Sequence, residues 1–301
     1  MKILLTGRNG QVGFELQRAL VPLGEIVPVD QAECDLADPA AIRRLVRDVR
    51  PGIIVNTAAH TAVDKAESEP TLAEAINGIA PGIMGEAARE IDALVVHYST
   101  DYVFDGRKAA PYGEDDLPNP QSVYGRTKHA GELALATSGA RHLTFRTSWV
   151  FGAHGGNFAK TMLRLAAERT SLRVVADQFG APTSAALIAD VTAQVLGQYL
   201  RRPANTDFPP FPYGLYHLVA GGRTNWHEFA KAIVRAAQVA GRPLRLGPDD
   251  IEAITTAEYP LPAPRPANSC LATDKLRDTF GLTLPDWRQG LDHVMTQLLG
   301  S

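Results

Sequence analysis

Tyr124 and Lys128 are the two side chains whose types and spacing best suit acid–base chemistry. They stand four residues apart in a segment predicted to be helical, so they share one face, a turn from each other. A free tyrosine, with a pKa of about 10, exchanges protons poorly at neutral pH. A neighbouring ammonium group favours the phenolate and lowers this pKa. The pair therefore predicts a general acid, Tyr124, whose pKa is tuned by Lys128.

Thr100 is the third residue of this candidate site. It ends a predicted strand that begins at Leu94, and open α/β sheets bind ligands beyond the carboxyl ends of their strands. Its hydroxyl could polarise the carbonyl oxygen that Tyr124 protonates, while a nicotinamide cofactor supplies the hydride. The alternative is an aromatic core contact beside a surface lysine, since this spacing also occurs by chance.

A glycine-rich loop provides the place for such a cofactor. Gly7, Gly10 and Gly13, with Gln11 and Val12 between the last two, separate a predicted strand from a predicted helix. Glycines permit the tight turn and the close approach of a pyrophosphate to the free amides of a helix N-terminus. We therefore predict that this loop binds a dinucleotide.

Two charges near this loop favour different cofactors. Asp30 ends the second predicted strand and can accept hydrogen bonds from ribose hydroxyls, which favours NADH. Arg8 could instead bind a 2′-phosphate, which favours NADPH. Either residue could also be a solvated loop charge. The sequence therefore predicts NADPH or NADH without ranking them.

The elements that must position these residues alternate between strand and helix. Strands are predicted at residues 2–6, 26–29, 53–55, 94–97 and 143–145, and helices at 11–21, after Asp38 and Pro39, at 72–90 and at 124–136. Fully apolar strands that alternate with helices indicate a parallel sheet covered on both faces. Right-handed crossovers make this an α/β, Rossmann-like, doubly wound fold.

The pattern changes after about residue 150. Helices are predicted at 157–168, 185–200, 226–240 and 287–299, and proline-rich segments at 203–212 and 259–266. We therefore expect a dinucleotide-binding domain over 1–150 and a smaller α/β substrate domain over 151–301. The helix at 185–200 is expected to pack back on the first domain.

Composition excludes several other classes of protein. A formal net charge of -3 argues against a nucleic-acid partner. No apolar run approaches the roughly 20 residues of a membrane helix. Cys34 and Cys270 form no CxxC motif, and the histidines show no ligand spacing such as HExxH. We expect a soluble cytoplasmic protein with no bound metal.

The motifs also resemble a known family. The sequence resembles the extended short-chain dehydrogenase/reductase superfamily and, within it, the dTDP-4-dehydrorhamnose reductase family. The segments that carry the resemblance are 7–13, 56–67, 98–106, 124–128, 146–150, 157–160 and 265–269. They span nearly the whole chain, and the strings AAHTAVDKAE and STDYVFDG are more specific than a fold motif.

The resemblance implies an activity and a set of site residues. The activity is NAD(P)H-dependent reduction of the 4-keto group of dTDP-4-dehydro-β-L-rhamnose to dTDP-L-rhamnose. By family pattern, the cofactor would be lined by Asp30, Asp35, Leu36, Ala59, His60, Thr61 and Tyr98, together with Tyr124 and Lys128. The dTDP-sugar would be faced by Thr100, Asp101 and Trp149, with Asn157 and Arg265 reaching its nucleotide or diphosphate.

Each of these residues also has a structural interpretation. Trp149 could be core, Asp101 a strand-end cap, and His60 a hydrogen-bonded structural histidine. Arg265 could pair with a local acid.

One family feature is not carried over. Some members bind Mg²⁺ through acidic residues between subunits. Glu15 is present here, but Ala186 stands where the second acid is expected. Because a divalent ion needs several oxygen ligands, we predict no metal site. A homodimer that depends on this ion is in doubt, and homodimerisation is left open.

Other functions remain as alternatives. A sugar-nucleotide dehydratase would need a second carboxylate after Thr100, whereas Asp101 is followed by Tyr102. A sugar-nucleotide epimerase would reuse the same tyrosine without consuming cofactor. A non-catalytic regulatory subunit of the methionine adenosyltransferase type would not need Tyr124, Lys128 and Thr100.

Overall fold

The computed structural model describes residues 1–202 and 209–300. Its centre is a six-stranded sheet in the order β10-β5-β4-β3-β1-β2, with every neighbouring pair parallel. The strands are β1 (Lys2–Thr6), β2 (Glu25–Val29), β3 (Ile53–Asn56), β4 (Leu94–Thr100), β5 (His142–Thr147) and β10 (Gly214–His217). The predicted doubly wound α/β fold is therefore confirmed.

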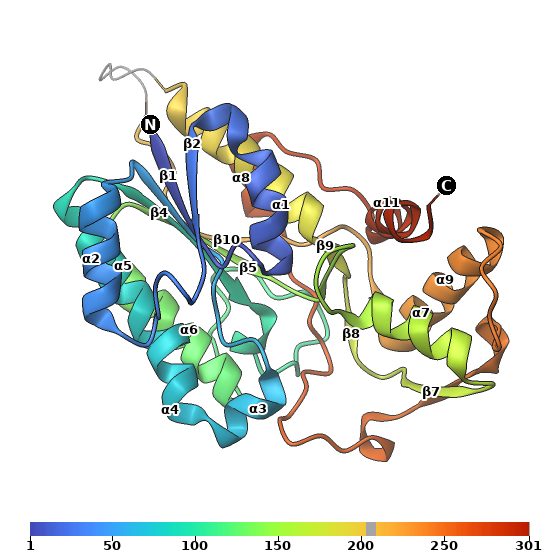
Figure 1. The fold of residues 1–301 in the computed structure, drawn as a ribbon. Coiled ribbons are helices and arrows are strands. Elements are labelled where there is room, and N and C mark those ends of the chain that lie inside the picture. The colour runs from blue at the N-terminus through green and yellow to red at the C-terminus, as the bar shows by residue number, and fades with distance from the viewer. Residues whose placement is uncertain (203–208, 301) are drawn as a thin grey trace.

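Both faces of this sheet are covered by helices, which explains why its strands are apolar at successive positions. Ile3 and Leu5 of β1 pack on one face, and Leu4 packs on the other. The first face carries α1 (Gln11–Ala19) and α8 (Ala185–Leu200), and the second carries α2 (Pro39–Val49), α5 (Ala80–Glu90) and α6 (Val123–Thr137) (Figure 1). Residues of α10 (Asp274–Phe280) also pack on the first face. Strands buried on both sides have no solvent-facing position, so they do not alternate with polar residues.

The strand order creates a crevice at one edge of the sheet. β1 lies between β2 and β3. The chain therefore adds β2 on one side of β1, and then adds β3, β4 and β5 on the other side. At such a switch point the connections diverge and leave a cleft beyond the carboxyl ends of the strands. Because all six strands are parallel, Thr6, Asn56 and Thr100 reach the same edge.

A smaller body follows β5 and has its own apolar core. Its elements are β6 (Val150–Phe151), α7 (Phe158–Glu168), β7 (Leu172–Val175), β8 (Phe179–Gly180), β9 (Thr183–Ser184), β11 (Thr224–Asn225), α9 (Trp226–Val239), β12 (Ile251–Ile254) and α11 (Trp287–Leu299). The chain returns to the large sheet after β9, where α8 packs against α1 and β10 pairs with β5 (Figure 1), and again at α10, which packs against β10. A division into two domains near residue 150 stays a prediction.

Several elements differ from the predicted ones. The helix expected at 72–90 consists of α4 (Pro70–Ala73), a π-helical segment η2 (Glu74–Ile79) and α5. Pro81 has no N–H to donate to the carbonyl four residues earlier, so regular helical bonding fails there. Likewise, α1 ends at Ala19, two residues before the predicted end at Val21, and the 3₁₀ turn η1 (Val21–Leu23), which contains Pro22, follows.

Other short elements were not predicted. They are α3 (Val63–Ser68), α10, the strands β6, β7, β8, β9, β10, β11 and β12, and the 3₁₀ turns η3 (Asp101–Val103), η4 (Pro248–Asp250) and η5 (Thr256–Glu258). The proline-rich stretch at 203–212 lies partly outside the described residues. Over the described ranges, no helix combines the length and the apolar character that a membrane crossing requires.

Candidate active site

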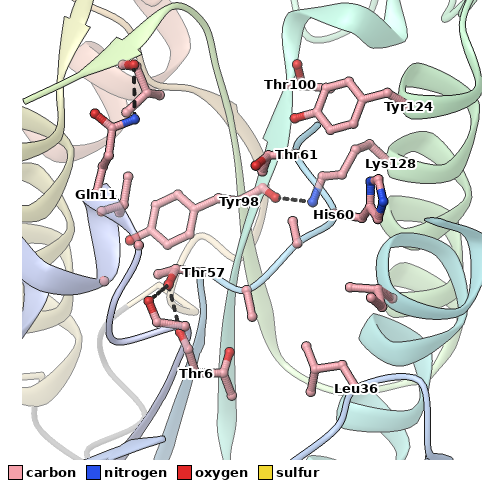
Figure 2. Close-up of a pocket in the computed structure, with 18 of the residues that line it drawn as sticks. Thr6, Gln11, Leu36, Thr57, His60, Thr61, Tyr98, Thr100, Tyr124 and Lys128 are labelled. Carbon is pink, nitrogen blue, oxygen red and sulfur yellow. Dashed lines mark hydrogen bonds between the residues drawn. The ribbon is translucent and has the colours of Figure 1, made fainter. Parts of the chain in front are cut away.

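A cavity of about 780 Å³ opens along the carboxyl edge of the sheet and gathers most of the predicted site residues. Figure 2 shows part of its lining. The predicted residues that line it are Gly7, Gly10, Gln11, Val12, Gly13, Asp30, Asp35, Leu36, Ala59, His60, Thr61, Tyr98, Thr100, Asp101, Tyr124, Lys128 and Trp149. Residues up to 142 positions apart in the sequence therefore share one wall.

The glycine loop fits the pyrophosphate of a dinucleotide. Gly7 adopts a left-handed conformation with φ of +75°, which favours glycine. A Cβ on Gly13 would lie 2.1 Å from the carbonyl oxygen of Gly7, so only glycine allows this contact. Gly10 precedes α1 and offers no side-chain cap, which leaves the first amides of the helix available to an anion.

Asp30, and not Arg8, lies at the cavity where the second strand ends. The Asp30 carboxylate accepts hydrogen bonds from the Asn9 side chain and, at 2.8 Å, from the Gln31 amide. Arg8 does not line the cavity: it pairs with Glu33 at 2.7 Å and donates to the Pro28 carbonyl at 3.1 Å. Of these two residues, only Asp30, a hydrogen-bond acceptor, lines the cavity.

Tyr124 is held beside Thr100 by the start of α6. The Ser122 hydroxyl caps this helix by accepting from the Gly125 amide at 3.1 Å. A Cβ on Gly125 would lie 2.2 Å from the Tyr102 carbonyl oxygen, so glycine lets α6 press against the segment after β4. Figure 2 shows the Tyr124 phenol next to the Thr100 hydroxyl.

The surroundings of Tyr124 correct one expectation. Burial raises the pKa of Tyr124 to about 12, although hydrogen bonding to Thr100 acts in the other direction. The expected lowering by Lys128 is absent because the ammonium is directed elsewhere: its Nζ donates to the Tyr98 carbonyl at 2.6 Å. At neutral pH, Tyr124 is therefore the neutral phenol that a general acid must be.

Lys128 is fully enclosed, at 2% exposure. Burial lowers the pKa of its ammonium to about 8, and the nearby Glu132 carboxylate opposes this shift. A lysine whose charge is lost just above neutral pH is unusual, and such shifts concentrate at functional sites.

Asp101 adds a buried carboxyl group next to Thr100. Burial raises its pKa to about 6, while hydrogen bonds from Ser269 and Thr100 act against the shift. The Thr100 hydroxyl donates to Asp101 Oδ1 at 3.0 Å. Asp101 is therefore one acceptor available to the Thr100 hydroxyl.

Trp149 lines the cavity from the smaller body. Its backbone has a φ of +49°, which is rare for a large side chain, and its ring stacks on Trp226 with centroids 3.7 Å apart. A Cβ on Gly180 would lie 2.7 Å from the ring, so that glycine makes room for it. An indole held this rigidly presents a flat apolar surface to the cavity.

Two residues predicted to bind the substrate do not line this cavity. The Asn157 amide caps α7 and donates to Gln11 Oε1 at 2.9 Å and to the Gly152 carbonyl at 2.7 Å. Arg265 pairs with Asp64 at 2.7 Å and lines an adjacent cavity of about 200 Å³. Their roles in substrate binding stay predictions.

Sequence reasoning missed several other residues of the wall. Thr147 ends β5 just as Thr100 ends β4, and Ser148 follows it, so the rule used for Thr100 could have found them. Tyr102 lies edge-on to Tyr124, with ring centroids 5.5 Å apart, inside the STDYVFDG string. Within the part of the chain that the structure describes, no three His, Cys, Asp or Glu side chains are placed to share a metal ion.

Known proteins resemble this chain over nearly its full length. The family described as RmlD substrate binding domain matches residues 1–299. A dTDP-4-dehydrorhamnose reductase from Escherichia coli (strain K12) is 50% identical over 302 residues, covering 99% of this chain and 98% of the relative.

Two solved structures of dTDP-4-dehydrorhamnose reductases also resemble this chain over nearly its full length. A dTDP-4-dehydrorhamnose reductase from Clostridium acetobutylicum has a TM-score of 0.89 at 36% identity, covering 99% of both chains. Another, from Bacillus anthracis in complex with NADP, has a TM-score of 0.86 at 34% identity and covers 98% of this chain and 99% of its own. The chain therefore belongs to the dTDP-4-dehydrorhamnose reductase family.

Proposed function

We propose that this chain reduces the 4-keto group of dTDP-4-dehydro-β-L-rhamnose to dTDP-L-rhamnose, with NADPH or NADH as the reductant. The observation that carries the proposal is that Thr100, Tyr124 and Lys128 line the same cavity as the glycine loop. Membership of the family supports the choice of substrate.

The residues of the chain supply the proton and the charge stabilisation. The bound cofactor contributes a hydride to the carbonyl carbon. Tyr124, a neutral phenol below its pKa of about 12, donates a proton to the carbonyl oxygen. Thr100 donates a hydrogen bond to the same oxygen once its hydroxyl turns away from Asp101. Lys128 lines the same cavity, and an N–H of its ammonium that the Tyr98 carbonyl does not take would hold the nicotinamide ribose.

The test is a single assay with two readouts. Purified protein receives the 4-keto-L-sugar nucleotide with NADPH or NADH, and absorbance follows cofactor oxidation while NMR identifies the product. We expect stoichiometric oxidation and dTDP-L-rhamnose. Product without net oxidation would instead support an epimerase, and oxidation only with unrelated ketones would leave a general reductase.

Cofactor choice yields a prediction about Asp30 and Arg8. Asp30→Ala should raise the KM for NADH more than that for NADPH, by about tenfold, since a charge-assisted hydrogen bond to a free 2′-hydroxyl is lost. Arg8→Ala should instead raise the KM for NADPH. Steady-state kinetics with both cofactors measure these effects.

Glu33→Gln is the matched control for Arg8. It removes the charge that holds Arg8 at 2.7 Å but keeps an oxygen for the Asp30 amide. We expect it to improve NADPH relative to NADH. Equal changes for both cofactors in every variant would show that neither Asp30 nor Arg8 contacts the ribose.

Arg265 yields a prediction about the nucleotide-diphosphate. Arg265→Ala should raise the KM for the sugar nucleotide about tenfold and leave that for NADPH unchanged, because a cation that contacts the diphosphate is lost. Asp64→Asn distinguishes the two roles of Arg265, since it frees the guanidinium from its partner. If the ion pair only anchors the 263–265 segment, the two variants will be equally impaired.

Location and assembly are also proposed. Cys34 and Cys270 are both free thiols, which supports a reducing cytoplasmic location. Assembly as a homodimer remains a prediction, and light scattering of the purified protein would measure it.

A further inference from the structure

A row of polar side chains crosses the sheet behind Lys128. Thr6 of β1, Asn56 of β3 and His97 of β4 are aligned by strand register, since Thr6 pairs with Asn56 and Asn56 with His97. All three are buried, with His97 at 1% exposure. Their neighbours two positions earlier, such as Leu4 and Val95, form an apolar core. Buried polar side chains on such a face are costly unless hydrogen bonds satisfy them.

These side chains form a continuous chain of hydrogen bonds that ends at Lys128. The Thr6 hydroxyl lies 2.7 Å from Asn56 Oδ1, and Asn56 Nδ2 lies 3.1 Å from His97 Nδ1. The other ring nitrogen, His97 Nε2, lies 3.2 Å from Lys128 Nζ. The Lys128 amine therefore connects this chain of hydrogen bonds to the active-site cavity.

The Lys128 ammonium has more N–H donors than the Tyr98 carbonyl can accept, so His97 affects where the other donors point. An ammonium has three donors and no acceptor. The Tyr98 carbonyl takes one donor at 2.6 Å, and His97 Nε2 is placed to take a second. One N–H then remains for the cavity that Lys128 lines. His97 thus determines which way the last donor points.

His97 can accept from Lys128 only as a neutral ring. Burial, followed by the Lys128 charge, holds the pKa of His97 well below its usual range, so the ring is neutral. A neutral imidazole carries one proton, and the nitrogen that lacks it is the acceptor. The partner of Nδ1, the Asn56 amide, therefore decides what Nε2 offers to Lys128.

The hydrogen bonds that connect Thr6, Asn56, His97 and Lys128 can run in either of two directions, and in each direction every donor meets an acceptor. With Asn56 Nδ2 donating to Nδ1, the His97 proton is on Nε2 and points at Lys128, which suits an uncharged amine. If the Asn56 amide turns over, its oxygen accepts from Nδ1–H, and Nε2 then accepts from the Lys128 ammonium. Each direction matches one protonation state of Lys128.

We propose that His97 is a positioning residue for Lys128, and that the Thr6–Asn56–His97 chain reverses direction when Lys128 gains or loses its proton. This inference rests on the proposed reductase function, because it assigns the supporting side chains of the same site. The chain keeps Lys128 hydrogen-bonded in both protonation states and leaves one N–H directed at the cavity.

Other titratable groups around these hydrogen bonds come from the neighbouring elements. They are Tyr124, Glu132 and His129 of α6, Tyr98 of β4, and His142 and Arg146 of β5. β1 and β3 contribute Thr6 and Asn56, which do not titrate. Of these groups, Glu132 acts on both partners and favours the charged form of each.

The first test compares His97→Phe with His97→Gln. Wild-type kcat should fall as pH rises past the Lys128 pKa of about 8, since the ammonium is lost. His97→Phe removes an acceptor that stabilises the charged form, so its alkaline inflection should move down by about one pH unit. Its kcat near neutral pH should fall about tenfold, with the KM for the sugar nucleotide unchanged. His97→Gln, which keeps an acceptor near the Nε2 position, should restore the wild-type profile.

His217→Phe is the matched control. His217 is also a fully buried histidine of the same sheet, and burial lowers its pKa to about 3, but its Nδ1 lies 3.1 Å from the Ala272 carbonyl. The His217→Phe variant should be less stable than wild type, but the alkaline inflection of its kcat should stay at the wild-type pH. A profile of His97→Phe that superimposes on wild type, or an equal shift in His217→Phe, would overturn the inference.

The second test uses the wild-type protein, so it does not depend on whether His97→Phe folds. Nitrogen-15 NMR of histidine-labelled wild type reports which ring nitrogen carries the proton. We expect one neutral ring to change from the Nδ1–H to the Nε2–H form between about pH 7 and pH 9, as Lys128 deprotonates. A single tautomer throughout would overturn the reversal. Absence of reduction by wild type in the same kinetic assay would instead count against the proposed function.

Discussion

Tyr124→Phe is expected to fold normally and to lose about 10²- to 10⁴-fold in kcat, the range that general acid catalysis contributes. The variant keeps the aromatic ring and its edge-on contact with Tyr102 but has no proton to donate. Single-turnover kinetics with saturating cofactor and sugar nucleotide measure the loss, and circular dichroism verifies the fold.

Tyr216→Phe provides the control for this change. Tyr216, on strand β10, is also buried, and its phenol donates to the Pro212 carbonyl at 2.8 Å. Its removal should cost about 1 kcal/mol of stability and leave kcat unchanged. A Tyr124→Phe enzyme with more than about half of wild-type turnover would remove Tyr124 from the acid role.

Glu132→Leu is expected to lower the free energy of unfolding by about 3–5 kcal/mol, because it leaves a buried charge without its partner. Glu132 accepts from Arg146 Nε at 2.8 Å and from Nη2 at 2.7 Å, and the two side chains are 7% and 3% exposed. This ion pair joins α6 to β5 directly beneath the site. Urea denaturation followed by tryptophan fluorescence measures the change.

A double-mutant cycle separates the ion pair from packing. Arg146→Leu should destabilise as much as Glu132→Leu, whereas the double variant should be more stable than either, since no unpaired charge remains. Additive losses would mean that the two side chains act independently.

The same pair should dominate acid unfolding. Burial alone would raise the pKa of Glu132, but hydrogen bonds from Arg146 and His129 outweigh it and bring the pKa to about 2. Because the folded pKa is below the unfolded one, Glu132 contributes stability above about pH 4.5 that is lost as pH falls towards 2.

The sequence predicted the parts of the site that depend on local chemistry. The glycine loop, the helix predicted from Tyr124 and the strand end at Thr100 each follow from neighbouring residues, and all three meet at one cavity. The apolar runs likewise predicted the sheet, because strands covered on both faces leave no polar position.

The sequence could not predict features that depend on distant partners. Arg265 pairs with Asp64, 201 residues away, and no local pattern connects them. The pKa of Tyr124 depends on burial and on the direction of the Lys128 amine, which a spacing of four residues does not reveal. β10 is only four residues long, and it forms a strand because it hydrogen-bonds to the edge of β5, a partner about 70 residues earlier in the sequence.

The origin of β10 has a consequence for synthesis on the ribosome. β5 ends at Thr147, but the strand that covers its edge spans Gly214–His217, about 70 residues later. At about 5–20 residues per second, β5 leaves the ribosome roughly 4–14 seconds before its neighbour does. During this interval an apolar, unpaired strand edge is open to other nascent chains, the situation in which aggregation begins. Slow translation across residues 150–213 should therefore lower the yield of folded protein, and a chaperone that shields β5 should restore it.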